Sequence, residues 1–218
     1  MVIFHFSFDL NNFHIVTLDL KHGDFWRYFR FVIVSMFVFS SGISLQLAYG
    51  KQIDIKKLIK RVLILSGAAL LVSIGSYTQF PKTWIYFGIL HFFLFASVAG
   101  LIFLRIPKIA LLLGLAIIAG YNFQLINMHW LYWKLQAPLH LPIDYTEDLA
   151  NVIPWFGVFL LGMSFAKFGL HYKLFDNRFF NSENRMNQSF SFLGRHSLFV
   201  YLIHQPILFS IFLLLKMF

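Results

Sequence analysis

Six segments of the chain are long and apolar enough to cross a lipid bilayer, and they constrain the fold more than any other feature. They cover roughly residues 26–47, 62–80, 84–104, 108–126, 152–170 and 197–217. Each predicts one crossing, because a transmembrane helix needs about 20 apolar residues. Of the 218 residues, 59% are hydrophobic and only 12% are charged, so a single water-soluble core could not bury the apolar side chains. The sequence therefore predicts an all-α, polytopic integral membrane helix bundle.

The chain opens with an apolar stretch, residues 1–8, that is too short to cross a bilayer. It lacks the basic first region of a signal peptide. We therefore expect the end of a truncated first helix, followed by six full spans, with residues 1–218 forming a single transmembrane domain.

Charged residues sort the connecting segments into two groups. Residues 48–61, 105–108 and 171–195 are rich in Lys and Arg, whereas 9–25 and 127–151 hold most of the acidic residues. Alternating spans place the basic segments on one side, which the positive-inside rule makes cytoplasmic. These loops account for the net charge of +9, so the expected partner is the lipid bilayer and not nucleic acid. We expect a multi-pass protein of a bacterial inner membrane, and association of identical chains is left open.

Several kinds of chemistry are excluded by what the chain lacks. It has no cysteine, which excludes thiol catalysis and Cys-ligated zinc. Its histidines are not set at metal-ligand spacing, so no metal is predicted. It also has no glycine-rich phosphate loop and no Gly-x-Ser-x-Gly elbow.

Ionisable side chains in apolar segments are costly and often mark function. His5 and Asp9 are four residues apart, so on a helix they share one face. A carboxylate beside an imidazole can fix its tautomer and make it an effective general base. The alternative is that water satisfies each side chain separately.

The last apolar segment carries Tyr201, His204 and Gln205 on one helix face. Pro206 follows and cannot donate to the carbonyl of Leu202, so we expect this face to line an interior cavity. His91 stands alone in its segment. Such a histidine is more often a structural hydrogen-bond partner than a catalyst, and both interpretations stay open.

An ordered set of motifs runs through nearly the whole chain. It comprises residues 1–10 (MVIFHFSFDL), 37–45 (FVFSSGISL), 86–91 (YFGILH), 144–145 (DY), 153–157 (IPWFG) with Gly162, 193–198 (LGRHSL) and 201–206 (YLIHQP). In these motifs the chain resembles the bacterial relatives of heparan-alpha-glucosaminide N-acetyltransferase. Its first and last motifs also resemble those of the wider transmembrane acyltransferase superfamily.

The resemblance implies a bundle that takes an acetyl group from cytosolic acetyl-CoA and delivers it to an amino sugar or another envelope glycan. By motif match, the candidate catalytic residues are His5, Asp9, His91, Asp144 and His204. His5 would act as a general base or as a transient acyl carrier, and Arg27, Tyr201 or His91 could stabilise the developing oxyanion. The candidate cations for the phosphates of acetyl-CoA are Lys56, Lys57, Arg61 and Arg195.

Two other functions are kept as alternatives. Buried histidines and a helix broken by proline also suit a small-solute transporter, although the two halves show no inverted repeat. An inactive truncated membrane protein is the other alternative.

Overall fold

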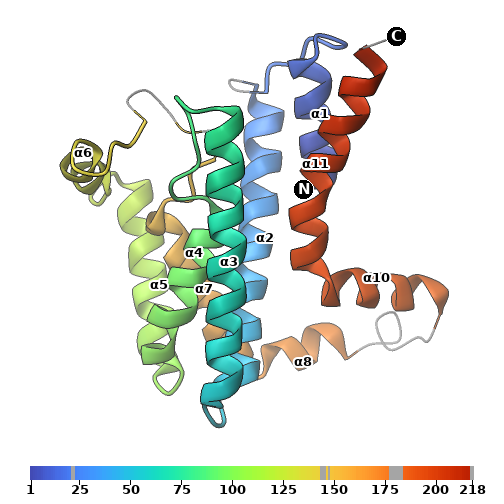
Figure 1. The fold of residues 1–218 in the computed structure, drawn as a ribbon. Helices are drawn as coiled ribbons and strands as arrows, with labels where there is room; N and C mark the ends of the chain where they lie inside the picture. Colours follow the sequence, from blue (N-terminus) through green and yellow to red (C-terminus); the bar gives the residue numbers. More distant parts are fainter. Residues whose placement is uncertain (21–22, 143–145, 147, 177–183, 217–218) are drawn as a thin grey trace. The chain divides into compact units, whose positions relative to one another are not determined.

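The computed structural model describes residues 1–20, 23–142, 146, 148–176 and 184–216 (Figure 1). Every regular element in these ranges is a helix, which confirms the all-α prediction. The elements are α1 (Val2–Asn12), α2 (Asp24–Tyr49), α3 (Ile55–Gln79), α4 (Ile89–Ala99), the 3-10 helix η1 (Gly100–Phe103), α5 (Pro107–Asn122), α6 (His129–Gln136), α7 (Val152–Lys167), α8 (Leu170–Phe175), α10 (Arg185–Arg195) and α11 (Ser197–Lys216).

Three of these helices are long and apolar enough to cross a membrane. They are α2 with 26 residues, α3 with 25, and an 18-residue stretch of α11. At a rise of about 1.5 Å per residue, helices of this length match a hydrocarbon layer about 30 Å thick. The other apolar segments form shorter helices over 89–103, 107–122 and 152–167. All six expected segments are thus largely helical, and three of them reach spanning length.

The chain forms two compact units. Unit 1 comprises residues 1–34 and 174–218, and unit 2 comprises residues 35–173. The helix α2 begins in unit 1 and continues into unit 2.

In unit 1, α1 runs beside α11, so the beginning of the chain pairs with its end (Figure 1). Aromatic rings fill the contact: Phe6 lies 5.6 Å and Phe13 5.4 Å from the ring of Phe212, measured between centroids. Phe212 is buried, with 4% of its surface exposed. This packing fixes which residues of the two helices face each other.

In unit 2, α5 packs closely against α7. A Cβ added to Gly157 would lie 2.8 Å from the carbonyl oxygen of Gly114, and the reverse distance is 2.9 Å. Side chains are therefore excluded at this crossing, as is typical of small-residue contacts in membrane helices. Phe156 and Phe159 of α7 stack 6.0 Å apart beside it, and Phe159 is fully buried.

The outward faces of the long helices are apolar. On α3, the exposed fractions of Leu63, Leu70, Leu71 and Ile74 lie between 59% and 66%. A water-soluble protein rarely exposes such a continuous apolar face. These side chains suit contact with lipid tails.

Candidate active site

Asp9 is the most buried carboxylate among the described residues, with 1% of its surface exposed. Its Oδ1 accepts a hydrogen bond of 3.0 Å from the side-chain amide Nε2 of Gln205. This bond joins α1 to α11 across 196 positions of the sequence. The same pairing of helices brings the ring of His204 to 4.8 Å from that of His5. The structure therefore gathers four polar side chains at one helix contact inside unit 1.

Three polar atoms at this contact are buried and have no hydrogen-bond partner. They are Oδ2 of Asp9, Nε2 of His204 and Oε1 of Gln205. In the described part of the chain, the one further atom of this kind is Nδ1 of His171, in α8. Buried polar groups in proteins are nearly always paired, so an unpaired one has hydrogen-bonding capacity that a ligand or a water molecule can use. Three of them together make this contact the candidate site.

The hydrogen bond of His204 defines its tautomer. Its Nδ1 lies 2.6 Å from the carbonyl oxygen of Tyr201. A carbonyl oxygen can only accept, so Nδ1 carries the proton. In the neutral ring, Nε2 then holds a lone pair and can accept a proton or a hydrogen bond.

His5 and Asp9 are not joined to each other in the way that their spacing suggested. They lie on α1 four residues apart, but Asp9 bonds to Gln205, while the His5 ring packs edge-on against His204. The hydrogen bond by which Asp9 would fix the tautomer of His5 is therefore not formed. The partners of both side chains come from α11.

His91 lies in unit 2, and hydrogen bonds engage both of its ring nitrogens. Nδ1 accepts from the backbone N–H of Gly88, at 3.2 Å, and so caps the start of α4. Nε2 lies 3.2 Å from the hydroxyl of Ser73, which itself donates to the carbonyl of Ile85. Since that hydroxyl proton is already used, the imidazole is the donor in the contact with Ser73. Both nitrogens of His91 thus support the turn between α3 and α4.

Asp148 also lies at the start of α4, and it was not among the candidates from the sequence. Its Oδ2 accepts from the N–H of Ile89 at 3.4 Å, where a helix favours negative charge. A Cβ at Gly88 would come within 2.9 Å of the same oxygen, so glycine lets the carboxylate approach. In the sequence, Asp148 is only an acidic residue in a loop, and nothing there indicates that it accepts a hydrogen bond from Ile89. Asp144, the carboxylate that was predicted instead, lies outside the described residues.

Three of the four expected phosphate-binding cations lie at the beginning of α3. Lys56 and Lys57 are exposed, and Lys57 Nζ lies 3.4 Å from Asp54. Arg61 is half-buried, and its Nε donates to the hydroxyl of Ser97 at 3.1 Å. Exposed ammonium groups next to an oriented guanidinium are chemically suited to phosphate. The fourth cation, Arg195, is exposed in the last turn of α10, in unit 1.

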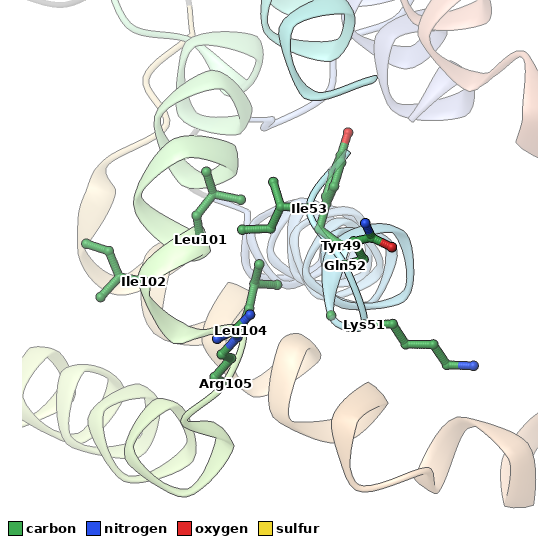
Figure 2. Close-up of a pocket in the computed structure, with 9 residues that line it drawn as sticks. Tyr49, Lys51, Gln52, Ile53, Leu101, Ile102, Leu104 and Arg105 are labelled. Atoms are coloured by element: carbon green, nitrogen blue, oxygen red, sulfur yellow. The ribbon is translucent and has the colours of Figure 1, made fainter. Parts of the chain in front are cut away.

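A small hollow of about 100 Å³ lies between the end of α2 and η1, and none of the four candidate cations lines it. Figure 2 shows Tyr49 and Gln52 on one side of it and Leu101 and Leu104 on the other, while Lys51 extends away. A space of this size holds a few water molecules, not a coenzyme. The hollow is therefore not a complete coenzyme site.

The family model described as heparan-alpha-glucosaminide N-acetyltransferase, catalytic, matches residues 1–206 of the chain. The chain belongs to this family. The match includes both helices of the α1–α11 contact, up to Pro206 in α11. No curated protein and no solved structure matches the chain.

Membership of the heparan-alpha-glucosaminide N-acetyltransferase family confirms the resemblance read from the motifs and implies an N-acetyltransferase. Together with the three helices of spanning length, it also marks the chain as an integral membrane protein. Among the described residues, no group of three or more His, Cys, Asp and Glu side chains could hold a metal ion.

Proposed function

We propose that the chain moves an acetyl group from cytosolic acetyl-CoA to the amino group of an amino sugar in an envelope glycan. The observation that carries this proposal is the set of three buried atoms without partners on Asp9, His204 and Gln205. With an ionised carboxylate and a neutral imidazole, all three atoms are hydrogen-bond acceptors. Their natural complement is a group with several N–H donors.

An amine meets this requirement better than a hydroxyl group. In its protonated form an amine offers three N–H donors and a positive charge, whereas a hydroxyl offers one donor and no charge. A buried carboxylate gains more from a cation than from a neutral donor. The site therefore favours N-acetylation over O-acetylation.

The side chains at the α1–α11 contact divide the chemistry between them. Asp9 binds the ammonium form of the acceptor, and Nε2 of His204 takes one proton from it. The neutral nitrogen then attacks the thioester carbon, a C–N bond forms, the C–S bond breaks, and the second proton of the attacking nitrogen passes to the leaving thiolate of CoA. His5, whose ring lies 4.8 Å from that of His204, either passes protons on or carries the acetyl group briefly.

Acetyl-CoA supplies the activated acetyl group, and basic residues hold its phosphates. Lys56, Lys57 and Arg61 follow one another along the first turns of α3, and Arg195 closes α10. Asp144 is kept as a further carboxylate of the site. We assign His91 to the support of the turn before α4, because both of its ring nitrogens are engaged.

We further propose that the chain crosses the bilayer six times after α1. The helices α5 and α7 have 16 residues each, or about 24 Å, which a modest thinning of the bilayer accommodates. The basic loops then face the cytoplasm of a bacterium and the acidic loops face outward. This arrangement puts the cations of α3 on the side from which acetyl-CoA comes.

Transfer of radiolabelled acetyl from acetyl-CoA to glucosamine, by the purified protein in liposomes, tests the proposed function. We expect transfer to glucosamine but much less to glucose. His5→Ala should reduce the rate about 10²- to 10⁴-fold, the usual contribution of an acid–base group. His196→Ala is the matched control, because His196 is exposed and lies outside the α1–α11 contact.

Two results would overturn this function. The first is wild-type protein that neither transfers acetyl nor binds acetyl-CoA. The second is solute flux across the same liposomes without acetyl-CoA, which would favour a transporter.

A further inference from the structure

Gln205 on α11 forms a side-chain hydrogen bond to Asp9 on α1. Its Nε2 donates to Oδ1 of Asp9. The ring of its neighbour His204 lies beside that of His5, which is on α1 like Asp9. The family match describes a reaction and does not assign a role to this amide.

The direction of this hydrogen bond determines what the rest of the site can bind. A carboxylate oxygen accepts, so the NH₂ end of the Gln205 amide must face Asp9. The opposite orientation would place two oxygen atoms against each other. Oε1 of Gln205 is consequently left as an acceptor, buried and without a partner, as is Oδ2 of Asp9.

The bond also orients the carboxylate. A buried Asp side chain with one oxygen held cannot turn freely about its last torsion angle, so its second oxygen has a defined direction. A ligand binds with higher affinity when the protein group that contacts it is already ordered before binding. A second, independent observation is the burial of the carboxylate: Asp9 is 1% exposed, whereas Gln205 is half-buried.

We propose that Gln205 is a positioning residue for the amine-binding carboxylate: it holds Asp9 by Oδ1 and presents Oδ2, together with its own Oε1, to the amine of the acceptor. The proposal rests on the proposed function, because it names the group that acceptor recognition requires. Gln205 acts on the reaction through Asp9 and through binding of the acceptor. It does not act through acetyl-CoA.

Gln205→Met tests this role, since methionine has a similar length and flexibility but no amide. We expect the KM for glucosamine to rise about ten- to a hundredfold, the fold-change that corresponds to one hydrogen bond to a charged group. The KM for acetyl-CoA should stay unchanged. Gln46→Met is the matched control, because the side-chain amide of Gln46 also donates a hydrogen bond to another segment of the chain, here to the carbonyl of Leu104 in unit 2. It should lower thermal stability without a change in the KM for glucosamine.

A double-mutant cycle shows whether Gln205 acts through Asp9. If it does, Asp9→Asn combined with Gln205→Met has no larger effect on the KM for glucosamine than Asp9→Asn alone. Asp9→Glu combined with Gln205→Asn moves one methylene from α11 to α1 and keeps the total reach. We expect this exchange to reverse part of the rise in the KM for glucosamine that Gln205→Asn alone causes.

The outcomes separate failure of this role from failure of the function. If the wild-type protein transfers no acetyl, the proposed function fails and the role of Gln205 fails with it. If the wild type is active but Gln205→Met changes only stability, as Gln46→Met does, then only the positioning role is wrong. Strictly additive effects of Asp9→Asn and Gln205→Met would also contradict it.

Discussion

Two histidine sites in this protein have the same kind of residues but opposite hydrogen bonding. Between α3 and α4, both ring nitrogens of His91 are engaged, with Gly88 and Ser73. Between α1 and α11, Nδ1 of His204 is engaged and Nε2 is buried without a partner. A fully paired imidazole has no capacity left for a ligand, whereas a half-paired one does. Unused hydrogen-bonding capacity, more than burial, therefore makes the α1–α11 contact, and not His91, the candidate site.

The largest effect should come from removing the unpaired nitrogen of His204 alone. In His204→Asn the shorter amide can still donate to the carbonyl of Tyr201, but it offers no basic nitrogen. We expect acetyl transfer to fall about 10²- to 10⁴-fold, because a proton acceptor is lost, with little change in the thermal midpoint. Initial rates and thermal unfolding in detergent measure the two quantities. Full activity of a folded His204→Asn protein would remove the basis of the comparison.

The next effect should come from the charge of Asp9. Asp9→Asn keeps an oxygen that accepts from Gln205 but removes the negative charge. We expect the KM for glucosamine to rise about ten- to a hundredfold, because a hydrogen bond to a charged group becomes a neutral one. Stability should not fall, because a buried charge without a counter-ion is itself costly. A strong loss of thermal stability with unchanged KM would instead make Asp9 a structural residue.

His91→Ala should show the reverse pattern. Losing the acceptor that caps α4 should lower the free energy of unfolding by about 1–2 kcal/mol. Activity per folded molecule should change by only a few-fold. His91→Gln is the control, because a glutamine at this position of a helix can reach back to the same backbone N–H. If His91→Gln is stable but inactive, His91 belongs to the catalytic residues after all.

Ser73 should matter less than His91. Its hydroxyl donates to the carbonyl of Ile85 and contacts Nε2 of His91. Ser73→Ala should lower stability by about 1 kcal/mol, the typical net value of a hydrogen bond. Chemical or thermal unfolding measures this, and activity serves as the second readout. A loss in acetyl transfer larger than the loss in stability would show that this turn takes part in the reaction.

The smallest effect concerns an exposed group outside both sites. Asp54 caps α3, and the hydrogen bond from the backbone N–H of Lys57 lowers the pKa of its carboxyl below the ordinary value of 3.8. Its contribution to stability is present above that value and is lost as the pH falls through the lowered pKa. Thermal midpoints measured from about pH 5 to about pH 2.5 should therefore decline less in Asp54→Asn, which caps the helix without titrating there. Equal slopes for the two proteins would contradict this role.

Much of the fold follows from the sequence. The six apolar segments mark where helices form, because a chain in lipid satisfies its backbone polar groups within each helix. The small residues Gly114 and Gly157 allow the close crossing of α5 and α7. The ends of the helices were predicted less accurately. The segment expected over 84–104 becomes helical only at Ile89, because Gly88 adopts an extended conformation and caps the helix.

The amino-acid sequence is sufficient to predict a helical membrane protein, its family, and the residues on each helix that could do chemistry. Spacing placed His5 and Asp9 on one face, and it placed His204 beside Gln205. The hydrogen bond from Gln205 to Asp9, 196 positions away, follows instead from the packing of α1 against α11. Spacing along a helix sets only which way a side chain faces. Its hydrogen-bond partner depends on the helix that packs against that face. The same packing determines which polar atoms are left without a partner.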